Sequence, residues 1–238
     1  VPCQNLNLTK MKTILFAFIV LSISSSQAQQ SNFNERLYNF CTDALSQIDK
    51  IPAERKVLLD NLAAEMTGKR HILFTCKTNS RRTLLLQAWA QAAFLYTGLF
   101  NKFALSSGDT ITEVYPKIAN VLMASGFYCS YAQNGNDKGY IISINDEYPI
   151  NIILSKNYFG TIDTSHTVIT NICADNELSN ISLNAKHFNL PYQSPTIYDK
   201  TEVEKLKYTE LNKTIAIEMM YLAQKTKENI AKSVKTKK

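Results

Sequence analysis

A cysteine and an arginine six positions apart are the residues of this sequence best suited by type and spacing to do chemistry. The segment Cys76-Lys-Thr-Asn-Ser-Arg-Arg82-Thr83 has the pattern Cys-x5-Arg-Thr and follows a short apolar run at residues 72–76. A loop of this length between a strand and a helix can turn its backbone N–H groups and the helix N-terminus toward one point. The segment therefore predicts a seat for a tetrahedral oxyanion.

Each residue type in the loop has a chemical reason to be there. The planar guanidinium of Arg82 can hold two oxygens of an anion at once. The positive field of the loop would favour the thiolate of Cys76, which is the nucleophilic form, and Thr83 could donate its hydroxyl to that sulfur. We predict Cys76, Arg82 and Thr83 as the catalytic residues. The predicted oxyanion-binding residues are Lys77, Thr78, Asn79, Ser80, Arg81 and Arg82.

The elements that must position this loop can be predicted from the periodicity of apolar residues. Two helices are expected within residues 33–67, broken near Pro52, and a third begins at Thr83. Further helices are expected over residues 115–125, with Gly126 in the capping position, and over residues 202–232. Strands are expected at residues 72–76, 103–107, 140–144, 150–154 and 167–172. Alternation of strand and helix predicts an α/β sandwich around a mostly parallel sheet.

The N-terminal region has the composition of an export signal. Met11-Lys12 precedes an apolar run that ends at Leu21, and Ser26-Gln-Ala28 supplies small residues where a signal peptidase would cut. The apolar run is shorter than the roughly 20 residues that cross a bilayer. We predict a signal peptide at residues 11–28, no stable membrane anchor, and a secreted or periplasmic protein. Residues 1–10 are expected to precede the natural start.

Composition limits the rest of the protein. The 238 residues are 45% apolar and 19% charged, which is typical of one globular domain. We divide them into a helical lead-in at 29–68, a catalytic domain at 69–224 and a lysine-rich tail at 225–238. The tail is expected to be solvated, so we predict no nucleic-acid partner. The cysteines and the three histidines match no zinc-binding spacing, so neither a metal nor a cofactor is expected.

The sequence of this loop resembles the corresponding loop of a known protein family. Cys76 to Thr83 is similar to the CxxNSxR[ST] loop of low-molecular-weight protein-tyrosine-phosphatases and of the arsenate reductases built on the same fold. Asn79 matches the asparagine that rigidifies that loop. The resemblance covers about residues 45–222, including a helical lead-in typical of a bacterial branch, and is thin across 128–165. It implies a three-layer sandwich with a central, mostly parallel four-stranded sheet.

Two departures from the family pattern bear on activity. Family phosphatases have an Asp-Pro pair whose aspartate protonates the leaving oxygen, and the matching place here is Ser194-Pro195. Asp175 and Asp199 are the candidate replacements for that general acid. Thioredoxin-coupled arsenate reductases pass a disulfide through further cysteines, and Cys173 is the candidate redox residue here.

The resemblance implies a cysteine-dependent phosphatase that hydrolyses phosphomonoesters, or an enzyme that reduces arsenate with a thioredoxin-like reductant as its partner. The signal peptide implies that this protein is exported. The alternative is a non-catalytic oxyanion-binding or interaction protein that has lost the general acid.

Overall fold

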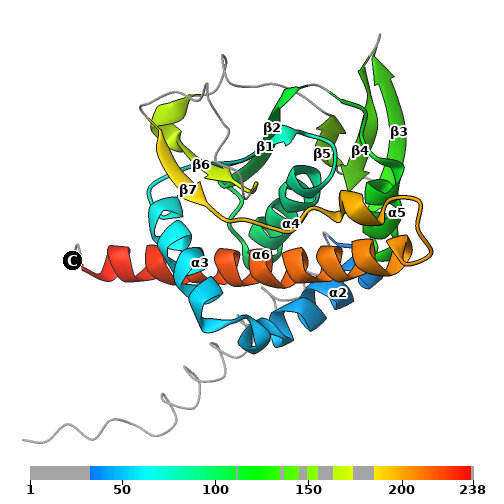
Figure 1. Cartoon of the computed structure of the whole chain (residues 1–238). Coiled ribbons are helices and arrows are strands. Elements are labelled where there is room, and N and C mark those ends of the chain that lie inside the picture. The colour runs from blue at the N-terminus through cyan, green and yellow to red at the C-terminus, as the bar shows by residue number, and fades with distance from the viewer. Residues whose placement is uncertain are drawn as a thin grey trace, which may run out of the picture.

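The computed structural model describes residues 33–110, 112–134, 137–144, 149–154, 163–173 and 185–236. The predicted signal peptide, the ten residues before it and Asp175 lie outside these residues. Four parallel strands form the central sheet in the order β2-β1-β6-β7 (Figure 1). Their bounds are β1 His71–Thr78, β2 Phe103–Thr110, β6 Thr167–Asn171 and β7 Lys186–Asn189. The predicted α/β fold with a central four-stranded parallel sheet is confirmed.

Helix α4 (Arg82–Thr97) lies directly against β1 and β2, and it is buried along nearly its whole length. A helix that is apolar on all sides belongs in the interior of a protein. The long helix α6 (Glu204–Lys235) crosses α4 on the side away from the sheet, where α2 (Glu35–Ser46) and α3 (Ala53–Met66) also pack (Figure 1). Along β1, Ile72, Phe74 and Cys76 join this main core, whereas Leu73 joins a smaller cluster with Ile169 and Ala185.

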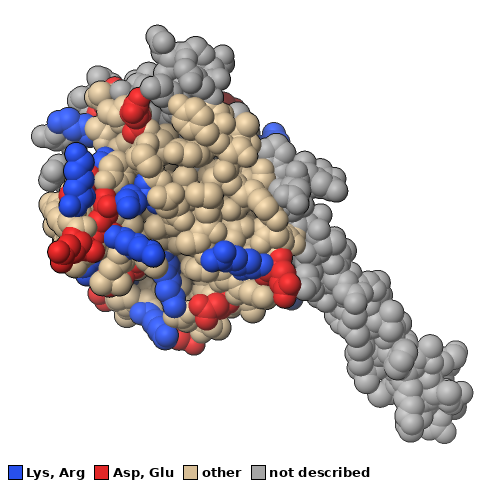
Figure 2. Space-filling view, turned by 90° about the vertical axis from the view of Figure 1, so that its right-hand side faces the viewer, with Lys and Arg blue, Asp and Glu red and all other residues tan. Residues whose placement is uncertain are grey.

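A second, antiparallel sheet stands beside the first. It consists of β3 (Tyr128–Asn134), β4 (Asp137–Ser143) and β5 (Pro149–Leu154), and it follows helix α5 (Pro116–Ala124). The sequence predicted strands at 140–144 and 150–154 correctly, but it assigned them to a mostly parallel sheet, which is wrong. Two residues separate β3 from β4, and a parallel neighbour needs a crossover of a dozen or more. On this side Figure 2 shows a broad area without charged side chains.

The residue that caps α2, Asn34, forms hydrogen bonds with the chain just after α5 and with the end of the second sheet. Asn34 caps α2 through a bond from the Leu37 N–H (2.9 Å), and its amide donates to the carbonyls of Gly126 (2.6 Å) and Ile144 (2.8 Å). Gly126 has a φ of 107°, and a Cβ atom there would come within 2.5 Å of the Leu37 nitrogen. Only glycine therefore allows α2 to approach this closely.

A buried ion pair joins the helical lead-in to α6. Arg55 of α3 donates from Nη2 to Glu218 at 2.8 Å and from Nε to both carboxylate oxygens, and its guanidinium lies 4.4 Å from the centre of the Tyr192 ring. The Tyr192 hydroxyl donates to the same carboxylate, and Arg55 Nη1 donates to the Pro191 carbonyl at 3.1 Å. The chain around Pro191 and Tyr192 is thus held from two helices at once.

Among the described residues, no helix is long and apolar enough to span a membrane.

We predict that Gly126→Ala lowers the free energy of unfolding by roughly 2 kcal/mol or more, because it combines a positive φ with a backbone collision. Gly68→Ala is the matched control, since nothing lies within 4 Å of its added Cβ and its φ is not positive. Urea titrations of both variants measure the difference. Equal stability of the two variants would contradict the contact between Gly126 and α2.

Candidate functional site

Cys76 lies near the carboxyl end of β1, on the side of the sheet that faces α4. Its exposed fraction is 5%. The strand was expected to end at Cys76, but it runs two residues further, because Thr78 still pairs with Thr110 of β2. Three residues, Asn79, Ser80 and Arg81, remain between β1 and α4. The predicted strand, loop and helix order is present, with a shorter loop than the sequence suggested.

Asn79 anchors this loop. It is fully buried, and its Oδ1 accepts a hydrogen bond from the Thr83 hydroxyl at 2.6 Å. The Thr83 hydroxyl was expected to reach the sulfur of Cys76, and the structure directs it to Asn79 instead. Asn79 also lies against Gly108 of β2, where a Cβ atom would come within 2.6 Å of the Asn79 nitrogen. Position 108 therefore has to be glycine for the loop to lie against β2.

The backbone N–H and carbonyl groups of Ser80 both form hydrogen bonds within the protein. The Ser80 N–H donates to the Thr78 carbonyl at 2.9 Å, and the Ser80 carbonyl accepts from the Tyr115 N–H at 3.1 Å. Lys77 and Thr78 are exposed and continue β1. The six residues predicted to bind the oxyanion, 77–82, therefore do not form one open cradle in this conformation, because part of the segment is still strand and the Ser80 N–H is already bonded.

Cys76 and Cys173 form a disulfide, with their Cα atoms 5.6 Å apart. Strands β1 and β6 are neighbours and run parallel, so their carboxyl ends meet at one edge of the sheet. The pairing continues past β6, because the Ile172 N–H donates to the Thr75 carbonyl at 3.0 Å. The next residue, Cys173, is held by its own N–H bond to Asn171 Oδ1, also at 3.0 Å. The sheet thus brings together two cysteines that are 97 residues apart in the chain.

Arg82, the first residue of α4, lies against both sulfurs. Its Nη2 is 3.4 Å from Cys76 Sγ and 3.4 Å from Cys173 Sγ. Its Nη1 donates to the Tyr192 carbonyl and lies 3.5 Å from the Ile172 carbonyl. A guanidinium in this place would stabilise a thiolate on either sulfur once the disulfide is reduced.

Arg81 points away from the sulfurs. Its Nη2 donates to Asp199 at 2.6 Å, its Nε to the Tyr208 hydroxyl at 2.9 Å, and its Nη1 to the Ser80 hydroxyl at 3.1 Å. The guanidinium carbon also lies 4.2 Å from the centre of the Tyr115 ring. The two adjacent arginines of the motif therefore have different surroundings, and the structure does not bring Arg81 to Cys76.

The two described positions considered for the general acid, Asp199 and Ser194, both have hydrogen-bond partners other than Cys76. Asp199 accepts hydrogen bonds on both oxygens, from Arg81 and from the Tyr208 hydroxyl at 2.7 Å. Ser194, at the place of the family's aspartate, bonds to the Thr196 hydroxyl at 2.7 Å. Asp175 lies outside the described residues. Asp199 is therefore better described as the partner of Arg81 than as an acid.

Three of the groups that hold the arginines could not be identified from residue types and spacing. The Tyr192 carbonyl is a backbone group, which residue types do not reveal. Tyr115 and Tyr208 are one residue before α5 and one turn into α6, at positions where an aromatic residue is ordinary core.

The remaining cysteines of the described chain, Cys41 and Cys129, belong to α2 and β3, and burial raises the pKa of each thiol to about 12.

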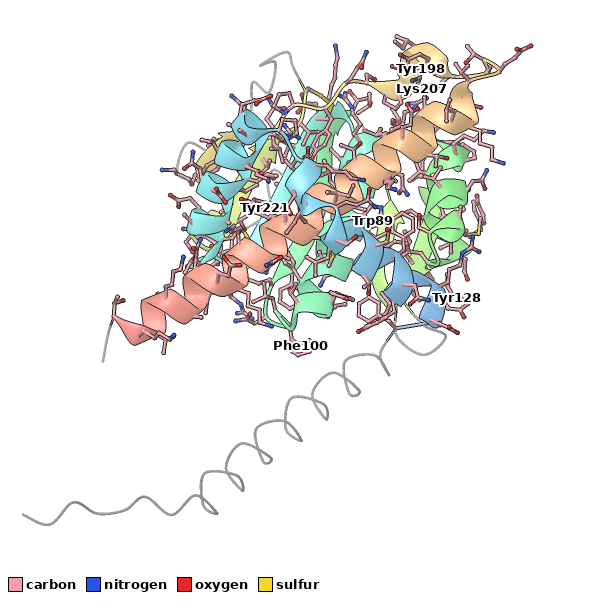
Figure 3. The ribbon with its side chains drawn as sticks, turned by 90° about the horizontal axis from the view of Figure 1, so that it is seen from below. Trp89, Phe100, Tyr128, Tyr198, Lys207 and Tyr221 are labelled. Atoms are coloured by element: carbon pink, nitrogen blue, oxygen red, sulfur yellow. A yellow bond between two sulfur atoms is a disulfide. The ribbon has the colours of Figure 1, made fainter. Side chains whose placement is uncertain are left out.

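A groove of about 790 Å³ lies near these residues but does not include Cys76. It is bounded by the start of α3, residues 191–198 and the first half of α6; Figure 3 shows two of its lining residues, Tyr198 and Lys207, at the N-terminal end of α6. Residues 190–199 therefore contribute both to the groove and to the surroundings of the arginines. Some of their side chains line the groove, while the Tyr192 carbonyl and the Asp199 carboxylate accept hydrogen bonds from Arg82 and Arg81. Within the described chain, no three His, Cys, Asp or Glu side chains group as metal ligands.

Comparison with known proteins finds similarity among solved structures. No known protein family matches the sequence, and no curated protein matches it. Among solved structures, the chain is similar to an arsenate reductase from Archaeoglobus fulgidus, with 13% sequence identity and a TM-score of 0.45. The match covers 64% of this chain and 98% of that chain.

Proposed function

We propose that this protein reduces arsenate, using Cys76 as the nucleophile and Cys173 as the second thiol. The observation that carries the proposal is the position of the two sulfurs: they are close enough to bond, at the ends of adjacent strands, with Arg82 in contact with both. A reaction that ends in a disulfide needs this arrangement, and hydrolysis of a phosphate ester does not.

The proposed reaction transfers two electrons. The Cys76 thiolate attacks arsenic(V) of the bound arsenate, a bond between arsenic and oxygen breaks, and that oxygen leaves as water after taking up protons from the solvent. The Cys173 thiolate then attacks Cys76 Sγ, the electron pair of the S–As bond passes to arsenic, and arsenite leaves as arsenic(III). The disulfide is the oxidised product. An external dithiol of the thioredoxin class must reduce it before the next cycle, because each turnover consumes both thiols.

Arg82 would serve both halves of this reaction. Before the first step its guanidinium would hold arsenate oxygens and favour the Cys76 thiolate. In the oxidised state that the structure describes, the same guanidinium is engaged by the two sulfurs and the Tyr192 carbonyl. Arsenite release and loss of the oxyanion site would therefore coincide.

Hydrolysis of phosphomonoesters is the second candidate, and the Cys-x5-Arg loop favours it. Such hydrolysis uses the same nucleophile and the same arginine, but it also needs a proton for the leaving oxygen. Asp199 is engaged with Arg81, so esters whose leaving groups are already stable anions would be the preferred substrates.

Export of the protein stays a prediction from the sequence, because the signal segment lies outside the described residues.

We predict that Cys173→Ser reduces thioredoxin-coupled arsenate turnover to the uncatalysed rate, because the bond between Cys76 and arsenic can no longer be broken by a neighbouring thiol. Oxidation of NADPH in the presence of thioredoxin and thioredoxin reductase measures the turnover. Cys129→Ser is the control, since that thiol lies on β3, and it should keep full activity. Undiminished turnover in Cys173→Ser would remove Cys173 from the mechanism.

The four cysteines of the described chain should separate into two classes toward iodoacetamide after reduction. At pH 8, thiols with a pKa of about 12 are thiolate to about one part in 10⁴, so Cys41 and Cys129 should stay unmodified while Cys76 and Cys173 react. Reaction of Cys41 should stay low up to pH 9, because its thiol is buried as well as protonated. Peptide mapping by mass spectrometry reads all four sites. Faster reaction at Cys129 than at Cys76 would contradict the assignment.

If the second candidate holds, turnover should fall steeply as the leaving group of a phosphate ester becomes more basic. Ser194→Asp, beside Pro195, should raise the hydrolysis of alkyl phosphates by roughly 10²-fold or more, which is the typical range of general acid catalysis. Thr196→Asp places the same charge two residues away and should not. A shallow leaving-group dependence in the unaltered protein would show that an acid is already present.

A further inference from the structure

Arg81 stands at the centre of a cluster that the proposed reaction does not use. The cluster consists of Arg81, Asp199, Tyr208, Tyr115 and Glu204. Asp199, the residue after the 3₁₀ turn Pro195–Tyr198, receives hydrogen bonds from Arg81 and from Tyr208. The Arg81 side chain is therefore oriented by one carboxylate, one hydroxyl and one aromatic ring.

This cluster is connected to the loop at two points. Arg81 Nη1 donates to the Ser80 hydroxyl, and the N–H of Tyr115 donates to the Ser80 carbonyl. Tyr115 is itself fixed, because its hydroxyl donates to Glu204 at 2.5 Å; this bond, together with burial, raises the pKa of Tyr115 to about 12. Lys117 also pairs with Glu204 at 3.3 Å. The path of the chain at Ser80 thus depends on the first turns of α5 and α6.

The bonds of Asp199 determine what its carboxylate can do. Each oxygen accepts a hydrogen bond from a donor that is itself placed by other contacts, at 2.6 and 2.7 Å. Both oxygens are therefore occupied by hydrogen bonds from other members of the cluster. Its chemical effect on the site can pass only through Arg81, and from Arg81 to Ser80.

We propose that Asp199 is a positioning residue: it holds Arg81 against Tyr115, and Arg81 in turn holds Ser80, so that the loop stays beside Cys76 and can bind an oxyanion there once the disulfide is reduced. Asp199 touches neither the substrate nor the transferred proton. The proposal rests on the proposed function in one respect, namely that the reduced loop binds an oxyanion.

Two measurements on the reduced protein test this proposal. The first is the dissociation constant for inorganic phosphate by calorimetry, and the second is the pH dependence of Cys76 alkylation, which reports the thiolate that the loop stabilises. Asp199→Asn should raise the dissociation constant about tenfold and move the alkylation profile toward higher pH. Tyr208→Phe removes two hydrogen bonds, the one from Arg81 and the one to Asp199, but leaves the ion pair between Arg81 and Asp199 in place. It should give a smaller change in the same direction, and it is the variant to measure if Asp199→Asn folds poorly.

A double-mutant cycle separates positioning from a direct role. Arg81→Gln should have an effect similar to Asp199→Asn, and the double variant should be no worse than either single variant, because both remove the same link. Glu210→Gln is the matched control: it changes a carboxylate of α6 that pairs with Lys207 at 2.8 Å, away from Arg81, and it should change neither readout. The proposal is wrong if the effects of the two single variants multiply in the double variant. It is also wrong if Asp199→Asn leaves both readouts unchanged.

The outcomes also distinguish this proposal from the proposed function. If the unaltered protein binds no phosphate, the oxyanion site itself fails, and the alkylation profile alone decides the role of Asp199: a shift supports positioning, and an unchanged profile refutes it. If Asp199→Asn melts at a lower temperature but leaves the profile and the dissociation constant unchanged, its role is structural only and the proposal is wrong.

Discussion

The candidate site depends on the parallel pairing of β1 with β6. Parallel neighbours present their carboxyl ends at the same edge of a sheet, and here those ends carry Cys76 and Cys173. The separation of their Cα atoms, 5.6 Å, is within the range that a disulfide bridges without movement of the backbone. Redox chemistry between the two sulfurs therefore follows from the topology, and Arg82, the first residue of the next helix, meets both of them.

The segment at residues 190–199 is the second support of the site. Its backbone at Tyr192 receives Arg82, and its last side chain, Asp199, receives Arg81. Adjacent arginines on the first turn of a helix repel each other and would otherwise spread into solvent. Acceptors on one segment fix them in two different directions, one toward the sulfurs and one toward α5. The motif thus divides the roles of its two arginines. The Cys-x5-Arg spacing singles out Arg82, but nothing in the sequence shows that Arg81 turns toward Asp199.

The sequence predicted those parts of the structure that depend on local patterns. Apolar periodicity located α4 and α6, and Gly126 marked the end of α5. Strands β3 and β7 were missed: β3 carries polar residues among its tyrosines, and β7 is four residues long, Lys186–Asn189, with a single large apolar side chain. The proximity of Cys76 and Cys173 could be suggested only through the family resemblance, since strand order is a property of the whole fold. Asp199 and Arg81 are 118 residues apart in the chain, so a local sequence pattern cannot predict that they pair.

The ion pair between Arg55 and Glu218 has a consequence for how the chain could have been assembled. Glu218 is buried, and removing one partner of a buried pair leaves a charge without compensation, which is strongly destabilising. A shorter protein that began at β1 would keep Glu218 and Tyr192 but lose Arg55. Helix α3 is therefore not a detachable segment that recombination could add to or remove from the rest of the fold without cost. A functional chain without α3 would be expected to carry an uncharged residue at position 218, because the ion pair ties the choice of residue there to Arg55.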